Sequence, residues 1–421
     1  MEKLAIIGTG IAGMACGHFL KDSYYVTLFE KNDYVGGHTN TVTVDEQGRD
    51  IHIDTGFMVY NEVTYPNLTR LFKELKVNTK PTSMSFSVQH RPSGLEFCGS
   101  GISGLFAQRK NIFNSRFYKL LKQIDRFNRE AVEIIDNPLY ADYTLFEYSK
   151  EKKYSNDFLI KYLIPMSSAV WSTRPDLMLK FPAVTLVRFF KNHGFLGLNT
   201  QHQWRTVVDG SQAYREKLIA PFKNKIIKDS PVKKIYRETD GVRVQTAGDE
   251  MKFDKVIIAS HADEALNMLG EPTQKERDIL KNFKYQKNSA TLHTDRNVMP
   301  KTKRAWSSWN YRIDDVEGQL KPSTIYYMNS LQQVSDKKDY FLSIDDHGLV
   351  DPGKILKVIM YEHPVFSVDA ISAQKELYKL NENDRVFFCG SYFGYGFHED
   401  ALNSSINLCN KLLTQKEEAV L

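Results

Sequence analysis

The residues with the clearest chemical meaning lie in the first thirty positions. Gly8-Thr9-Gly10-Ile11-Ala12-Gly13 is a GxGxxG pattern, and Glu30 follows 22 residues after Gly8. In a dinucleotide site the first glycine allows a tight turn, the second lets the backbone approach a diphosphate, and the third lets a helix pack against a strand. The carboxylate accepts hydrogen bonds from a ribose 2′-hydroxyl and repels a 2′-phosphate, which argues against NADP. We therefore predict a dinucleotide site, against the alternative of a tight turn without a ligand.

Three elements must position these residues. Leu4–Ile7 is a continuous apolar run that predicts a buried parallel strand, Ile11–Leu20 has helical spacing, and Tyr25–Phe29 predicts a second strand that ends at Glu30. The free N–H groups at the N-terminus of such a helix face the phosphates of the ligand. The order of strand, glycine turn, helix, strand and acid is the one that dinucleotide binding requires.

A second glycine pair follows the acid, in the stretch Lys31-Asn32-Asp33-Tyr34-Val35-Gly36-Gly37-His38. It resembles the E-x(5)-GG element of FAD-binding proteins in the flavin amine oxidase and phytoene desaturase superfamily. Those proteins usually carry arginine after the pair, where this chain has His38. The resemblance implies FAD as the cofactor, with Glu30 and Lys31 near its adenosine.

The C-terminal part of the chain contains a second element of the same kind. Arg385–Ser391 predicts a strand that ends in glycine, and Gly394–Leu402 precedes a helical pattern. This resembles the closing element of the superfamily, in which a helix N-terminus points at the flavin ring. Ser391 stands where an acid usually contacts the ribityl chain, and it still offers a hydroxyl. The alternative for the glycine-rich stretch is a flexible surface loop.

The resemblance assigns residues from several parts of the chain to the cofactor. Val232, at the start of a strand, is expected to place a backbone group on the adenine. No cysteine or histidine falls where a covalent flavin bond is expected, so the predicted FAD is non-covalent. The assigned residues are Gly8, Gly10, Ile11, Ala12, Gly13, Glu30, Lys31, Gly36, Gly37, His38, Gly56, Phe57, Val232, Gly390, Ser391, Phe397, His398 and Ala401.

The predicted fold class is α/β, a Rossmann-like FAD-binding domain with an interleaved mixed substrate domain of the amine oxidase type (α+β overall). The FAD-binding domain is expected in three pieces, near 1–75, 200–282 and 350–421. The segments 76–199 and 283–349 are left for the substrate domain, the first mainly helical and the second mixed.

Several short elements narrow the resemblance. They are Ile53–Tyr60, Arg188–Gly194, Trp306–Tyr311 and Met328–Gln333. They match a bacterial family of FAD-dependent oxidoreductases that resembles the N-terminal flavoprotein half of plant cyclopropane fatty acid synthases. His38 fits this narrower family. The resemblance implies a lipid or fatty acyl substrate and a lipid-modifying methyltransferase as a partner, although fold analogy does not fix a function.

The expected chemistry is hydride transfer from an activated C–H bond of an acyl chain to flavin N5, with a base removing a proton to leave a double bond. The candidates for the proton step are His398, Glu399 and Tyr60, and histidine has the most suitable intrinsic pKa. The alternative role for His398 is a cofactor-loop hydrogen bond without proton transfer.

Three other functions remain open at this point. An amine oxidase needs an aromatic cage, for which Tyr326, Tyr327 and Tyr395 are available. A redox-neutral double-bond isomerase uses the same cofactor. A non-catalytic flavoprotein partner of a lipid methyltransferase is the third alternative.

Composition and charge limit the partners. The chain has 421 residues, a net charge of +5 and 12% aromatic residues, without a nucleic-acid-binding motif. Four cysteines without zinc-ligand spacing predict free thiols, no metal site and a cytoplasmic location. The stretch near 105–122 mixes apolar residues with cations and predicts peripheral membrane contact, against the alternative of a packed helix with a solvated basic face.

Overall fold

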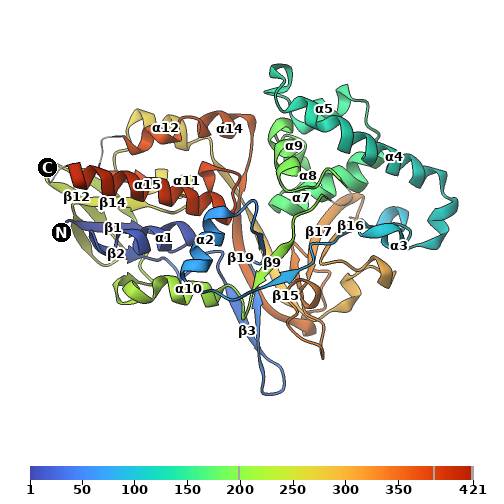
Figure 1. Ribbon diagram of the computed structural model, residues 1–421, viewed down its shortest axis with the longest axis horizontal. Coiled ribbons are helices and arrows are strands. Elements are labelled where there is room, and N and C mark those ends of the chain that lie inside the picture. Colours follow the sequence, from blue (N-terminus) through green and yellow to red (C-terminus); the bar gives the residue numbers. More distant parts are fainter. Residues whose placement is uncertain (198–199, 383–384, 419–421) are drawn as a thin grey trace.

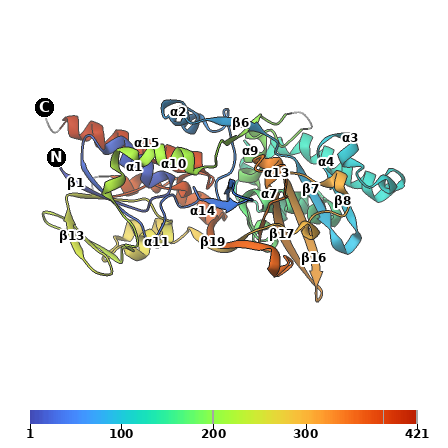
Figure 2. The same ribbon diagram turned by 90° about the horizontal axis from the view of Figure 1, so that it is seen from below.

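In the computed structural model, which describes residues 1–197, 200–382 and 385–418, the chain forms two lobes side by side. Figure 1 shows both termini at the outer end of one lobe and helices α3 (Gly101–Leu105) and α4 (Ser115–Glu130) at the outer end of the other. Figure 2 shows the same arrangement from below, with the long strand β19 (Ile355–Val365) between the lobes.

The lobe with the termini is built on a five-stranded parallel sheet. Its strands, in spatial order, are β10 (Ile226–Ile227), β2 (Tyr25–Phe29), β1 (Lys3–Ile7), β14 (Lys255–Ile258) and β20 (Val386–Phe388). Side chains alternate between the two faces of the sheet. Leu4 and Ile6 therefore enter one hydrophobic cluster while Ala5 and Ile7 enter another. The predicted α/β fold is confirmed.

Helices cover both faces of this sheet. On one face α1 (Ile11–Leu20) packs against α15 (His398–Glu418) and α10 (Gln212–Ile219). On the other face lie α11 (Ala262–Met268), α12 (Gln274–Leu280) and α14 (Val368–Gln374), with an antiparallel sheet of β11 (Lys234–Glu238), β12 (Gly241–Gln245) and β13 (Glu250–Phe253). The helix α1 begins directly after the glycine turn, as the sequence predicted.

The second lobe is built on a seven-stranded sheet. Its order is β19, β15 (Lys284–His293), β18 (Phe341–Ile344), β17 (Gln319–Tyr327), β16 (Trp309–Val316), β7 (Phe86–His90) and β8 (Leu95–Cys98). All neighbours are antiparallel except β16 and β7. The strand β19, within the segment 350–421 expected in the FAD-binding domain, pairs with β15 in this sheet. The division into domains otherwise stays a prediction.

The first insert contains the helices expected of it. Its helices after α3 and α4 are α5 (Leu145–Glu151), α6 (Asn156–Phe158), α7 (Ile164–Trp171), α8 (Pro175–Met178) and α9 (Ala183–Asn192). The remaining elements are β3 (Thr41–Asp45), β4 (Asp50–Asp54), β5 (Tyr60–Asn61), α2 (Pro66–Glu74), β6 (Thr79–Thr82), β9 (Trp204–Val207) and α13 (Met328–Leu331). Among the described residues, no helix combines the length and the apolar character needed to cross a bilayer.

Candidate cofactor and active site

The two glycine turns of the sequence meet at the N-terminus of α1. Gly8 adopts a φ of 98°, and a Cβ on Gly13 would lie 1.9 Å from the Gly8 carbonyl oxygen. A Cβ on Gly37, which has a φ of 58°, would lie 3.2 Å from Gly10 Cα. A Cβ on Gly10 would have no heavy atom within 4 Å, so the backbone there faces open space. This is the cradle that a diphosphate requires, with Ile11 and Ala12 buried in the first helical turn behind it.

Glu30 is buried at the end of β2 and held by four donors. Oε2 accepts hydrogen bonds from the Thr9 backbone N–H, at 3.1 Å, and from the Thr9 hydroxyl. Oε1 accepts from the backbone and side-chain amides of Asn32, both at 2.9 Å. A carboxylate offers about four lone-pair positions. A ribose hydroxyl therefore reaches Glu30 by replacing one of these local donors.

The residues expected around the adenosine lie close to Glu30. The Ser230 N–H donates to the Glu30 carbonyl at 2.8 Å, which brings the loop that carries half-buried Val232 beside the acid. Lys31 Nζ lies 2.6 Å from Glu264 Oε1, so this cation is engaged at the rim. Glu264 also belongs to a triad with His261 and Glu362 whose ligand atoms lie within 4.8 Å of one another.

His38 is the most unusual polar group of the site. Its Nε2 is buried without a hydrogen-bond partner, and its ring stacks on Tyr361 with centroids 4.7 Å apart. Burial, and then the neighbouring rings of His363, His261 and His398, hold the pKa of His38 well below its usual range. A buried donor or acceptor without a partner is costly. The orphaned nitrogen beside the glycine cradle therefore fits a ligand that supplies the missing partner.

Gly56, Phe57 and His398 form the next part of the same wall. The Phe57 N–H donates to the His38 carbonyl at 2.7 Å, and a Cβ on Gly56 would lie 2.3 Å from that oxygen. The ring of His398 stacks on Phe57 at 3.9 Å, and its Nε2 lies 3.2 Å from the Thr39 hydroxyl. Burial lowers the pKa of His398 to about 3, so the ring is neutral at physiological pH.

The closing element forms a tight loop ahead of α15. Gly390 has its N–H bonded to Ser404 Oγ at 2.9 Å, and the Ser391 carbonyl accepts from the N–H groups of Gly394 and Gly396. Gln374 Nε2 donates to the Gly394 carbonyl at 2.6 Å. These bonds fix the loop, which is therefore not a flexible surface segment. Phe397 and Ala401 follow in the first turn region of α15, with the Ala401 N–H bonded to the Phe397 carbonyl at 3.1 Å.

Glu399 and Tyr60, two of the three candidates for proton transfer, have structural contacts. The Glu399 carboxylate accepts from the N–H groups of Asn67 and Leu68, both at 2.9 Å, and so caps the N-terminus of α2. The Tyr60 hydroxyl donates to Thr79 Oγ1 at 3.3 Å, and its ring packs on Phe72. Of the three, His398 lies in the wall that also contains His38 and Phe57.

A wall of stacked aromatic rings faces the closing loop from the helices of the first insert. Phe189 of α9 stacks on Phe397 at 5.0 Å and on His193 at 3.9 Å. Trp171 of α7 lies 4.7 Å from Phe189 and donates from Nε1 to the Tyr395 carbonyl at 3.1 Å. Sequence reasoning missed this wall, because helical spacing of aromatic residues is the same in a core and in a pocket.

Two further contacts were not expected from the sequence. Tyr361 of β19 reaches across to the cradle, where its hydroxyl bonds to Thr55 Oγ1 at 2.8 Å. Gln332 donates from Nε2 to buried Asp54 at 2.7 Å and accepts from the Asp54 N–H at 2.9 Å. The Ile53–Tyr60 and Met328–Gln333 elements are therefore joined by a two-bond contact between lobes.

The three tyrosines suggested for an amine-binding cage do not assemble. Tyr326 and Tyr327 are consecutive residues of β17 and so point to opposite faces of the sheet. Tyr327 packs on Phe341 and donates to Asp339 at 2.6 Å, whereas Tyr395 lies against Phe189. Alternation along the strand is the physical reason for this correction.

Comparisons with known proteins agree with this geometry. A family model described as flavin containing amine oxidoreductase matches residues 11–341. A 15-cis-phytoene desaturase of Synechococcus elongatus is 33% identical over 95 residues, which are 21% of this chain and 19% of that relative's length. The match thus spans about a fifth of the desaturase.

Solved structures extend the likeness to the whole fold. Cyclohexylamine oxidase from Brevibacterium oxydans has a TM-score of 0.69 at 14% identity, over 98% of this chain and 99% of that chain. A fatty acid isomerase from P. acnes that produces CLA has a TM-score of 0.66 at 14% identity, over 97% and 98% of the two chains. At these identities the likeness is one of fold.

The glycine cradle, the buried acid and the matching family define the class of protein, an oxidoreductase that uses a flavin. The chain belongs to the family of flavin-containing amine oxidoreductases, within the amine oxidase and phytoene desaturase superfamily that the glycine motifs indicated. The residues present fit a flavin dinucleotide, because the open Gly10 backbone and the orphaned His38 nitrogen lie in the same wall.

Proposed function

We propose that the protein binds FAD non-covalently and oxidises an apolar acyl chain, such as that of a fatty acid or phospholipid, at a C–H bond. The FAD, when bound, supplies the hydride acceptor. The proposed residues of the cofactor site are those of the glycine turns, Glu30, the His38–Phe57 wall and the closing loop. The residues of the chain bind and orient the cofactor, exclude water and handle the proton.

The observation that carries the substrate class is the wall in which Trp171, Phe189 and His193 pack against Phe397 of the closing loop. Burial lowers the pKa of His193 to about 4, so its ring contributes no charge at neutral pH. Stacked uncharged rings favour an extended apolar chain, since an apolar ligand surface placed against them is removed from water. An ammonium group would gain cation–π attraction there but no carboxylate partner from these four side chains.

For the proton step we propose His398, because its ring lies in the wall with Phe57 and its Nε2 lies within hydrogen-bond distance of the Thr39 hydroxyl. Thr39 in turn contacts the Tyr214 hydroxyl, which gives a short chain of exchangeable protons leading away from the ring. A neutral imidazole accepts a proton at one nitrogen while the other donates. Loss of a hydride and of this proton from adjacent carbons leaves a double bond.

Redox-neutral isomerisation of a double bond is the second candidate. It uses the same apolar wall, and one solved structure with this fold is described as a fatty acid isomerase. Desaturation consumes an electron acceptor whereas isomerisation returns the hydride to the same chain. A non-catalytic role beside a lipid methyltransferase is the remaining alternative, and it requires neither reaction.

The test begins with the visible spectrum of the purified protein, followed anaerobically as extracted membrane phospholipid is added. We expect flavin absorbance that bleaches with lipid and is unchanged by cyclohexylamine or putrescine. Mass spectrometry of the lipid then distinguishes an added double bond from a shifted one. Flavin that appears in the supernatant after acid precipitation establishes the non-covalent bond. Bleaching by amines alone would contradict the acyl substrate, and an unchanged lipid would support the non-catalytic role.

A matched pair of variants tests the wall itself. Phe189→Leu keeps an apolar side chain and should retain most of the lipid activity. Phe189→Asn places an amide against the substrate and should lower kcat/KM at least tenfold, because the amide must be desolvated. Equal activities of the two variants would show that the wall does not contact the substrate. The flavin absorbance of each variant controls for loss of cofactor.

A further inference from the structure

The outer end of the second lobe carries exposed apolar side chains among cations. Phe113 is 91% exposed and Ile102 is 79% exposed, and Ile112 and Tyr118 are exposed beside them in the chain. Single exposed apolar residues need no explanation, but a group of large ones within seventeen residues marks an interaction surface. We call the surface formed by α3, the 3-10 turn Arg109–Phe113 and the first half of α4 the end surface.

The end surface is a folded unit that holds these side chains outward. Phe106 packs between Phe117 and Tyr118, with ring centroids 5.7 and 5.9 Å apart, and so fastens α3 to α4. Asn114 caps α4 by accepting from the N–H groups of Arg116 and Phe117. Figures 1 and 2 both show α3 and α4 at the end of the molecule farthest from the termini. A broad flat partner therefore reaches this surface without meeting the other lobe.

The charge of the end surface is positive throughout. Residues 98–124 contain no acid, and their five cations are Arg109, Lys110, Arg116, Lys119 and Lys122. Asp157 of α6 is the carboxylate that meets them. It pairs with Arg116 at 2.8 Å and with Lys161 at 2.7 Å, so two cations share its one charge. The end surface therefore fits a partner that carries negative charge.

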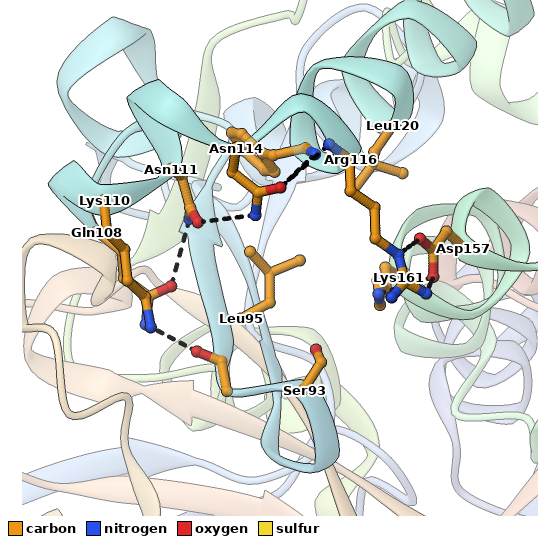
Figure 3. Close-up of a pocket in the computed structure, with 12 residues that line it drawn as sticks. Ser93, Leu95, Gln108, Lys110, Asn111, Asn114, Arg116, Leu120, Asp157 and Lys161 are labelled. Atoms are coloured by element: carbon orange, nitrogen blue, oxygen red, sulfur yellow. Dashed lines mark hydrogen bonds and ion pairs between the residues drawn. The ribbon is translucent and has the colours of Figure 1, made fainter.

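A cavity of about 290 Å³ opens behind the 3-10 turn. Figure 3 shows the amide side chains of Asn111 and Asn114 between Lys110 on one side and the paired Arg116, Asp157 and Lys161 on the other. Phe113 lies in the chain between the two asparagines. The cavity is lined by three cations, Lys110, Arg116 and Lys161, and by one carboxylate, Asp157. Its net positive charge and its amide and ammonium donors suit the phosphate of a lipid headgroup.

We propose that the end surface docks the protein on the surface of an anionic phospholipid bilayer. Phe113 and Ile102 enter the boundary of the acyl chains, Lys119 and Lys122 face the headgroups, and one phosphate occupies the cavity beside Lys110. Apolar insertion and electrostatic attraction together are what holds amphipathic segments in a bilayer interface. The docking goes beyond the proposed oxidation and does not depend on it.

The experiment uses the FAD-loaded full-length protein and sedimentation with vesicles. We expect binding to vesicles of equal parts phosphatidylcholine and phosphatidylglycerol, little binding to pure phosphatidylcholine, and release at high salt. Phe113→Ser with Ile102→Ser should abolish most of this binding. Lys119→Gln with Lys122→Gln should weaken it about 25-fold, at roughly fivefold for each lysine near an anionic surface.

The control is a second exposed apolar pair that lies outside the end surface. Val358 and Met360 of β19 are 52% and 61% exposed and lie on one face of that strand. Val358→Ser with Met360→Ser should leave vesicle binding unchanged. Equal losses from the two serine pairs, or unchanged binding after the Phe113 and Ile102 replacements, would overturn the proposal.

A spectroscopic readout keeps the test independent of yield and folding. Phe113→Trp should shift its fluorescence to shorter wavelength when the anionic vesicles are added, because the indole leaves water. Met360→Trp is the matched probe and should not shift. Absence of a shift at position 113 with vesicles that do sediment the protein would show that another surface makes the contact.

Discussion

At the scale of single residues, two of the three glycines of the first turn, Gly10 and Gly13, have different surroundings. A Cβ on Gly13 would lie 1.9 Å from the Gly8 oxygen, whereas a Cβ on Gly10 would meet no atom within 4 Å. Gly13 therefore permits the packing of the fold, whereas Gly10 leaves the backbone open to a ligand. These surroundings agree with the separate roles that the motif predicted for the two positions.

This difference predicts that alanine at Gly13 affects stability and that alanine at Gly10 affects cofactor binding. Gly13→Ala should lower the free energy of unfolding by about 3 kcal/mol, since backbone must move to admit the methyl group. Gly10→Ala should leave that free energy within about 0.5 kcal/mol but weaken FAD binding at least tenfold. Gly248→Ala, where a Cβ also meets nothing, is the control. Urea unfolding and quenching of FAD fluorescence measure the two effects, and equal behaviour of the Gly10 and Gly13 variants would contradict the assignment.

His38 gives a prediction about pH. Its pKa is held well below 6.5 by burial and by the neighbouring histidines, so it is neutral before a diphosphate arrives. A negative ligand raises the pKa of the ring, and binding then takes up a proton. Affinity for FAD should therefore rise as the pH falls toward and below 6.5, by at most about tenfold per pH unit.

The variant His38→Gln tests that assignment. Because glutamine does not titrate, it should remove most of the pH dependence, while His202→Gln, on a half-buried side chain that contacts the Asn192 carbonyl, should keep it. Fluorescence titrations at several pH values supply the comparison. If the FAD affinity of the His38 variant depended on pH as steeply as that of the parent protein, another group would take up the proton on binding.

At the scale of elements, Glu399 links two helices. It lies in the first turn of α15, yet its carboxylate accepts hydrogen bonds at the N-terminus of α2, from Asn67 and Leu68. Since α2 has no side-chain cap of its own, this distant acid satisfies its free N–H groups and meets the positive end of its dipole. These contacts are structural, and no local pattern in the chain predicts them.

We therefore expect Glu399→Gln to lower the free energy of unfolding by about 1 kcal/mol, through loss of the charge at the helix end. The pH profile of kcat should keep its shape, because no proton passes through this side chain. His398→Gln is the contrasting variant and should lower kcat without the same loss of stability. A changed pH profile in the Glu399 variant would restore it as a proton-transfer candidate.

At the scale of the whole molecule, buried neutral histidines make stability depend on pH. Burial lowers the pKa of His193 and of His293 to about 4 from 6.5. The unfolded chain binds protons at these positions first as the pH falls below 6.5, so stability is present above that value and is lost progressively down to about pH 4. Protonation of each ring in the unfolded chain lowers the free energy of unfolding by about 1.4 kcal/mol at one pH unit below 6.5.

Urea unfolding at about pH 7.5 and about pH 5.5 measures this effect, and we expect a fall of about 3 kcal/mol from the two rings. His293 lies in the seven-stranded sheet, with its Nε2 2.8 Å from Ser343 Oγ. His293→Gln should therefore remove its own share of the pH dependence, about 1.4 kcal/mol, without reaching the cofactor cradle, because the other buried histidines keep theirs. Equal stability of the parent protein at both pH values would contradict the neutral buried state.

The sequence by itself determined the parts of this protein that are local in the chain. The turn at Gly8–Gly13, the helix behind it, the strand that ends in Glu30 and the closing strand at Val386–Phe388 all follow from residue types within a few positions of one another. Glycine conformation, apolar periodicity and helix N-termini act over short stretches. The motifs in these stretches carry the resemblance to the flavin amine oxidase superfamily, which the family match confirms.

Only the tertiary structure decided what distant segments do together. It placed β19 in the second lobe, brought Tyr361 to the cradle, joined Asp54 to Gln332, gave Glu399 to α2 and assembled the aromatic wall from α7, α9 and the closing loop. Contacts between residues more than a hundred positions apart depend on how whole sheets pack. No spacing within the chain encodes them, and for this reason the aromatic wall and the hydrogen-bond partners of the candidate residues appear only in the folded molecule.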